Sequence, residues 1–135
     1  MSKHTPEGAV LKEFGFTVPL IPPSVNHYKT RFANGNTVVS KEAAAFKAAV
    51  ARFAKGRFVT AKEFYVRMVI VLGKGERGDV DNFPKLVLDG MADCGVFRDN
   101  EGKRLSDSHV VWMSVSVDRN SRPDQGQTDV EVRAL

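Results

Sequence analysis

The sequence predicts a single α+β domain in which one mixed β-sheet is packed against helices. The chain has 135 residues, which is the usual size of one domain. Apolar residues recur with strand and helix periods in the order strand, hairpin, helix, strand, helix, strand, strand. No internal repeat is present, and this order of elements implies the α+β class.

The N-terminal part predicts a strand followed by a hairpin. Residues 1–12 are polar and aperiodic, so we expect a loose arm there. The run EFGFTVPLI at 13–21 is typical of a strand, and Pro22-Pro23 closes it because proline cannot donate a ladder hydrogen bond. Asn34-Gly35 lies between two short runs, KTRF and NTVV, and this dipeptide predicts a two-residue hairpin turn.

A helix and a long strand come next. Ser40 is a candidate N-cap, and the helix that it begins should end at Gly56. Phe46 and Val50 lie on one face of this helix. The run EFYVRMVIVL at 63–72 then alternates, with apolar residues on both faces. This pattern predicts a central strand with neighbours on both sides.

The C-terminal half predicts a second helix and two strands. Asp81 is a candidate cap for a helix over about 82–94, with Gly95 as its stop. The run VVWMSVSV at 110–117 predicts a third long strand. The run TDVEVRAL predicts a last strand, which we expect to pair with its predecessor in a hairpin.

Charge and apolar content limit the class of protein. Lys and Arg number 20 against 16 Asp and Glu, and the resulting net charge of +4 suits a polyanionic partner. No apolar run is long enough to span a bilayer, and the N-terminus lacks the apolar segment of a signal peptide. We therefore expect a cytoplasmic protein with no membrane partner. The single cysteine, Cys94, excludes an internal disulfide, and we interpret it as a small core residue.

Residues 78–100 concentrate five aspartates beside one lysine and one arginine. Asp79 and Asp81 flank one residue at the predicted strand-to-helix junction, where both can hold one hard cation. Oxygen ligands without soft ones favour Mg²⁺, with Mn²⁺ as an alternative. With Lys85, the pattern D-x-D-N-x-x-K fits phosphodiester hydrolysis, because the cation generates hydroxide and the ammonium offsets developing negative charge. The competing interpretation is a capping aspartate and a Lys85–Asp89 ion pair on a solvated helix face.

The same stretch resembles the signature of the RusA family of Holliday junction resolvases. DVDNFPKLVLDGMADCGVFRDN carries D-x-D-N-x-x-K, a later aspartate and a glycine-hydrophobic-aromatic-x-aspartate run without gaps. LIPPSVNHYK and VSKEAAAFKAAV look like the family's P-P-S-x-N segment and V-S-x-E helix start. The resemblance covers residues 16–100 well and the C-terminal third loosely. It implies that residues 13–135 form a RusA-like endonuclease domain.

The resemblance implies a homodimer that resolves four-way DNA junctions by paired, Mg²⁺-dependent nicks in recombination and repair. The family is common in phages and prophages. Asp79 and Asp81 match its first two catalytic aspartates, which hold the metal, and Lys85 matches its catalytic lysine. Asn100 stands where the family has its third catalytic aspartate. The resemblance therefore leaves Asp99, Asn100 and Glu101 as candidates to complete the metal site.

Asn100 leaves three alternatives open. An amide keeps an oxygen ligand but removes one negative charge, which weakens the hold on a divalent cation. A neighbouring carboxylate replaces the missing ligand, or the protein is a catalytically weakened junction-binding protein, or the residue was engineered to trap a complex. A rival of another class is a small interaction or metal-sensing domain whose acidic helix is only capped and solvated.

Basic residues in loops near the motif predict a DNA-binding surface whose affinity depends on salt. Trp112, on a predicted strand, is interpreted as a core or dimer-interface residue. The predicted DNA contacts are Asn26, Lys29, Arg31, Lys74, Arg77, Asn82, Arg98, Lys103 and Arg104. Arg119 and Arg122, in the loop between the last two predicted strands, are further candidates.

Overall fold

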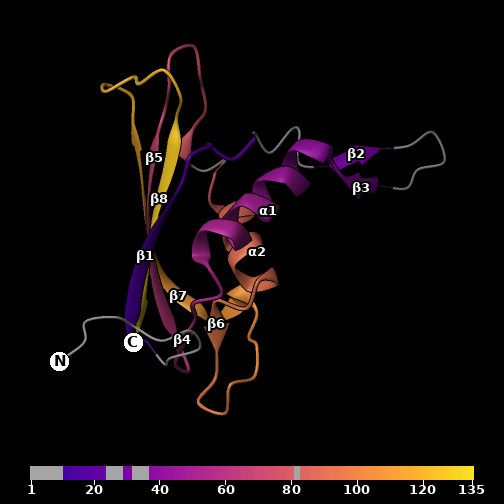
Figure 1. Cartoon of the computed structure of the whole chain (residues 1–135), viewed down its shortest axis with the longest axis vertical. Coiled ribbons are helices and arrows are strands. Elements are labelled where there is room, and N and C mark those ends of the chain that lie inside the picture. The colour runs from indigo at the N-terminus through magenta and orange to yellow at the C-terminus, as the bar shows by residue number, and fades with distance from the viewer. Residues whose placement is uncertain (1–10, 24–28, 32–36, 81–82) are drawn as a thin grey trace.

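A four-stranded mixed sheet, with strands in the order β1-β8-β5-β7, carries two helices on one face (Figure 1). The structure is a computed structural model, and it describes residues 11–23, 29–31, 37–80 and 83–135. The strands are β1 (Glu13–Val18), β5 (Phe64–Val71), β7 (Val110–Asp118) and β8 (Gln127–Ala134). β8 is antiparallel to both β1 and β5, whereas β7 is parallel to β5. The predicted α+β domain with one mixed sheet and a central β5 is confirmed.

Shorter strands and a 3₁₀ helix accompany the four-stranded sheet. β2 (Lys29–Arg31) and β3 (Thr37–Val39) form the predicted antiparallel hairpin, and its Asn34-Gly35 turn lies outside the described residues. β4 (Val59–Thr60) pairs in parallel with β6 (Phe97–Arg98), and the 3₁₀ helix η3 (Asp107–His109) leads into β7. Most of the predicted N-terminal arm also lies outside the described residues. None of the helices within the described ranges is long and apolar enough to cross a membrane.

The first helix begins and ends where its capping residues predict. α1 spans Lys41–Ala54, and the Ser40 hydroxyl accepts a hydrogen bond from the Ala43 N–H at 3.2 Å. A side-chain cap of this kind satisfies one of the free N–H groups of the first turn. α1 ends at Ala54, and Lys55 and Gly56 both have positive φ, so the chain leaves the helix just before the predicted glycine.

The second helix begins later than predicted. α2 spans Pro84–Asp93, and its N-cap position is occupied by Phe83, which makes no side-chain cap hydrogen bond. The prediction that Asp81 caps this helix is therefore wrong, and Asp81 itself lies outside the described residues. Proline lacks an N–H and restricts the residue before it, so it favours the first helical position. Gly95, with φ of 79°, follows the C-terminus as predicted.

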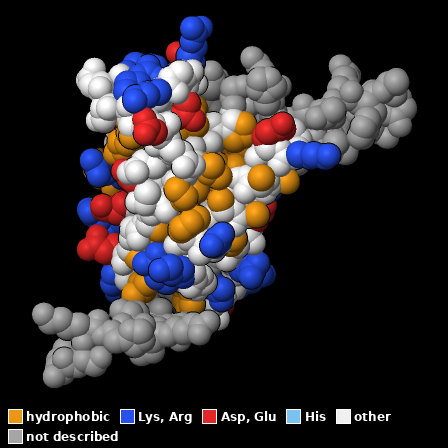
Figure 2. Space-filling model, turned by 45° about the horizontal axis from the view of Figure 1, so that its top comes forward, with side chains coloured by type: hydrophobic (Ala, Val, Ile, Leu, Met, Phe, Trp, Pro, Cys, Tyr) orange, Lys and Arg blue, Asp and Glu red, His pale blue; other side chains and the backbone are white. Residues whose placement is uncertain are grey.

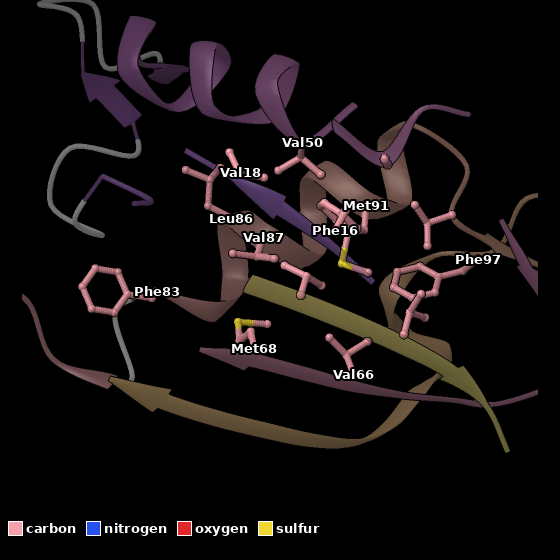
Figure 3. Close-up of a cluster of buried hydrophobic side chains, with 14 of the residues drawn as sticks. Phe16, Val18, Val50, Val66, Met68, Phe83, Leu86, Val87, Met91 and Phe97 are labelled. Atoms are coloured by element: carbon pink, nitrogen blue, oxygen red, sulfur yellow. The ribbon is translucent and has the colours of Figure 1, made fainter. Parts of the chain in front are cut away.

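The core fills the space between the two helices and one face of the sheet (Figure 3). Alternate residues of β1 and β5 point toward the helices and are buried, because side chains of a strand alternate between its two faces. Each helix contributes one apolar face to the same cluster. The labelled members are Phe16, Val18, Val50, Val66, Met68, Phe83, Leu86, Val87, Met91 and Phe97.

The last strand does not pair with its predecessor, so the predicted C-terminal hairpin is wrong. β8 lies between β1 and β5, and β7 lies on the far side of β5. The loop between β7 and β8 therefore crosses the C-terminal end of β5. There the Lys74 N–H donates to the Pro123 carbonyl at 2.9 Å, and the Arg122 guanidinium donates to the carbonyls of Gly73 and Glu76 at 3.0 and 2.6 Å. These contacts fix the crossing.

Replacing Arg122 by alanine is expected to lower the free energy of unfolding by about 2 kcal/mol, because charge-assisted hydrogen bonds to two partly buried carbonyls are lost. Urea denaturation measures the change. Arg119→Ala is the matched control, since Arg119 lies in the same loop and its ion pair with Asp79 is long, at 3.9 Å. Equal effects of the two variants would contradict a structural role for Arg122.

Candidate functional site

Asp79 lies on the link between β5 and α2, at the end of the sheet where the loop between β7 and β8 crosses β5. Gly78 and Phe83 bracket this link: a Cβ added to Gly78 would lie 2.1 Å from the ring of Phe83, which is buried. Glycine therefore lets the ring pack directly on the backbone. This contact holds Gly78, the residue immediately before Asp79, against Phe83. Asp81 and Asn82 lie outside the described residues.

The Asp79 carboxylate is open to solvent. Its side chain is 80% exposed, and the nearest described cation is the Arg119 guanidinium at 3.9 Å. Arg119 belongs to the loop that Asp118 shapes, because the Asp118 carboxylate accepts from the Ser121 hydroxyl and from the N–H groups of Ser121 and Asn120. These hydrogen bonds lower the pKa of the Asp118 carboxyl, and the bond from the Ser121 hydroxyl has the largest effect. The oxygens of a carboxylate are hard ligands, and an exposed carboxylate suits a hydrated Mg²⁺ ion.

Lys85 lies in the first turn of α2, six residues after Asp79. Its ammonium lies 3.7 Å from the Asp89 carboxylate, so the predicted i,i+4 ion pair is present. The Lys85 side chain is 67% exposed. An exposed ion pair of this kind contributes little to stability. The ammonium is thus accessible to a phosphate at the same end of α2 as Asp79.

A hollow of about 660 Å³ opens at this end of the molecule, close to the size of ordinary small-molecule pockets. Three segments that are far apart in the sequence line it. Pro22 and Pro23 come from the P-P-S-x-N segment, Glu42 from the V-S-x-E helix start, and Arg77 from the approach to Asp79. Two segments singled out by the family resemblance therefore meet beside the residues that immediately precede Asp79. Sequence reasoning did not select Glu42, although the V-S-x-E pattern contains it.

Residues 99–101 lie at the other end of the sheet (Figure 1). They follow β6, which pairs with β4 just before β5 begins. The Asp99 carboxylate accepts from the N–H groups of Glu101 and Lys103, both at 2.9 Å, and so stabilises its own turn. The ten residues of α2 span about 15 Å between this turn and the Asp79 link. Within one chain, the structure does not bring Asp99, Asn100 and Glu101 to Asp79.

No three His, Cys, Asp or Glu side chains within the described ranges are grouped closely enough to hold a metal ion together. Asp81, the predicted second ligand, is outside those ranges.

The predicted DNA contacts divide between the two ends of the molecule. Lys74 and Arg77 are exposed at the Asp79 end together with Arg119, and Lys74 pairs with Asp124 at 2.9 Å. In Figure 2 basic and acidic side chains lie together at the upper end of the view. Lys103 is exposed at the opposite end. Lys74, Arg77 and Arg119 are thus the predicted contacts that the structure describes as exposed at the candidate site.

Three of the predicted contact arginines hold the fold together. Arg122 binds the carbonyls described above. Arg98 lies over the Phe58 ring at 4.3 Å and donates to the Gly95 carbonyl at 3.0 Å, while Arg104 donates to the Asp93 carbonyl at 3.1 Å. Lys29 and Arg31 lie in β2, and Asn26 and Asn82 fall outside the described residues.

The surroundings of Cys94 and His109 indicate that these two residues are structural. Cys94 is half-buried against the core, and burial raises the pKa of its thiol, so it is a poor nucleophile at neutral pH. His109 Nδ1 forms a hydrogen bond with the Lys62 carbonyl oxygen at 3.1 Å. Trp112 is 63% exposed, so the core alternative for this residue is wrong.

In comparisons with known proteins, no family model matches the chain and no curated protein matches it. Function is therefore inferred from the residues and their arrangement.

Proposed function

We propose that the protein is a Mg²⁺-dependent endonuclease of the RusA type, which acts as a homodimer and makes paired nicks in four-way DNA junctions. One observation carries the proposal. The P-P-S-x-N segment, the V-S-x-E helix start and the approach to D-x-D line a single hollow, although Pro22 and Arg77 are about fifty-five residues apart in sequence. Chance similarity in sequence gives no reason for these segments to meet in space.

The residues at this end fit the proposed chemistry. Asp79, together with its sequence neighbour Asp81, would hold the cation, which would supply an activated water for attack on the phosphodiester. Lys85 offsets the negative charge that develops on the phosphate oxygens. Lys74 and Arg77 hold the DNA backbone in position by contacts with its phosphates.

Residues 99–101 require a second chain if they take part. Because α2 and the length of β5 separate them from Asp79, they cannot share an ion with it inside one subunit. In the proposed function the ligands from a single chain are therefore Asp79 and Asp81, and any contribution of Asp99, Asn100 or Glu101 comes from the other subunit of the homodimer.

Cleavage of a synthetic four-way junction and of its linear duplex, resolved on gels with Mg²⁺ and with a chelator, tests the proposal. The unaltered protein should nick only the junction, in symmetric pairs and only with Mg²⁺. Asn100→Asp should cut at least as fast, because it restores a carboxylate. If only Asn100→Asp cuts while both proteins bind, the protein is the weakened junction-binding alternative. If neither protein binds the junction, the proposal is wrong.

A further inference from the structure

The strand β7 forms an edge of the sheet that the described chain does not cover. Within the described residues, β7 pairs with β5 alone. None of its nine residues is buried, and Val111, Trp112 and Met113 are 54%, 63% and 42% exposed. Large apolar side chains at such exposure in one short segment mark an interaction surface.

The exposed apolar groups lie on both faces of the sheet. Trp112 lies beside Tyr65 on the face away from the helices, with the two ring centroids 5.0 Å apart, whereas Met113 lies beside the buried Val66 on the helix face. A partner that covers only one face would leave the other exposed. The observation therefore points to a partner that adds to the edge itself, as a further strand does.

The edge also lacks the features that usually prevent pairing. Residues 110–117 contain no charged side chain and no proline, although exposed edges are normally protected by such residues. The opposite edge of the sheet, formed by β1, differs in its side chains. In β1 exposed and buried residues alternate, and Glu13 there is paired with Arg133 of β8. An uncharged edge is also unsuited to contact with phosphates.

We propose that a second copy of this chain pairs its β7 antiparallel with this edge, so that two sheets join into one of eight strands. The homodimer belongs to the proposed function, and the inference rests on it in that respect. Two copies related by a twofold axis use the same surface, so the surface must be self-complementary. For side-by-side antiparallel strands that axis is perpendicular to the sheet, and it pairs each residue with one on the same face.

The side chains of β7 meet this requirement. The strand pairs regularly with β5 from Trp112 to Asp118, beyond the irregularity between Phe64 and Tyr65. Met113, Val115 and Val117 share the helix face of this segment, whereas Ser114 and Ser116 share the other face. Pairing centred on Val115 places Met113 opposite Val117 and Ser114 opposite Ser116. Apolar and hydroxyl cross-strand pairs are both favourable, so the segment fits a copy of itself.

This arrangement has a consequence for the candidate site. Both helical layers lie on the same face of the joined sheet. Because the strands are antiparallel, the C-terminal end of each β7, where Arg119 approaches Asp79, lies beside the N-terminal end of the other. Each Asp79 is then close to the dimer interface.

Sedimentation velocity on the whole chain without DNA tests the proposal independently of any nuclease activity. The unaltered protein should sediment as a dimer, and Ser116→Lys should shift it to the monomer. Thr17→Lys is the matched control, because it adds the same charge at an exposed position on the β1 edge, and it should remain a dimer. A monomeric unaltered protein, or a dimer that Ser116→Lys leaves intact or Thr17→Lys dissociates, would overturn the proposal.

A cross-link gives a second readout that does not depend on a disruptive variant. In a Cys94→Ala background, Val115→Cys places one thiol on the proposed axis, where directly opposed Cα atoms lie about 4.5–5.5 Å apart, within disulfide range. Mild oxidation should convert most of this variant into a covalent dimer, whereas Thr17→Cys in the same background should stay unlinked. No cross-link at position 115, or equal cross-linking at both positions, would place the interface elsewhere.

Discussion

Replacing Asp79 by asparagine is expected to slow Mg²⁺-dependent nicking of a four-way junction at least about a hundredfold, while the junction is bound as tightly as before. The carboxylate supplies negative charge that holds the cation, and an amide oxygen supplies none. DNA affinity depends on the basic side chains, so losing an acidic group does not weaken it. Single-turnover cleavage and equilibrium binding at one salt concentration measure the two effects separately.

The fold should tolerate this change. Asp79 is 80% exposed, and its ion pair with Arg119 is too long and too solvated to contribute measurable stability. Asp124→Asn is the charge-matched control, because Asp124 is 92% exposed on the neighbouring loop and pairs with Lys74. We expect its nicking rate to stay within about threefold of the unaltered rate. Undiminished cleavage by the Asp79 variant would remove Asp79 from the proposed metal ligands.

Local signals in the sequence predicted the helices and most strands. Ser40 and Gly56 bound α1, and Gly95 follows α2, because caps act through hydrogen bonds and backbone angles within a few residues. The apolar run at 63–72 predicted the extent of β5 and its internal place in the sheet, but not which face is buried, because apolar residues occur on both faces. The start of α2 was misjudged because an aspartate ahead of a proline resembles a cap, whereas the helix begins at Pro84 itself.

Strand neighbours were not predictable in the same way. Alternation in β8 predicts a strand, but the period of two is the same whichever strand lies beside it. Pairing with β1 and β5 depends on a loop that crosses the end of β5, and that crossing depends on contacts about fifty residues apart in sequence, such as Arg122 with Gly73. Sequential strands often form hairpins, and that general tendency misled the prediction here.

The candidate site illustrates the same limit. Residues 79–100 form one uninterrupted motif in the sequence, which suggests one cluster of ligands. In the structure the motif contains the whole of α2, so Asp79 lies before the helix and Asn100 lies beyond its other end, after β6. The hollow, by contrast, joins segments that no spacing rule connects. A motif identifies residue types with a shared chemistry, but only the fold determines which of them can act together.

Replacing Gly126 by alanine is expected to destabilise the protein by about 3 kcal/mol, the largest effect of a single methyl group that we predict. At the crossing, a Cβ on Gly126 would lie 2.6 Å from the Val71 carbonyl oxygen and 2.1 Å from a carboxylate oxygen of Glu76. The Glu76 side chain can move, but the Val71 oxygen belongs to the backbone of the central strand. Relief therefore requires the loop to lift away from β5, which breaks the contacts that Arg122 makes there.

Gly75→Ala separates this steric effect from the ordinary cost of a positive φ. Gly75 lies in the turn beneath the same loop, has φ of 76°, and has no atom within 4 Å of an added Cβ. Its substitution should cost about 1 kcal/mol, from backbone conformation alone. Urea denaturation of both variants, with unchanged slopes, compares them directly. If Gly126→Ala costs no more than Gly75→Ala, the loop does not hold β8 in place at this crossing, and the pairing of β8 must depend on its side chains within the sheet.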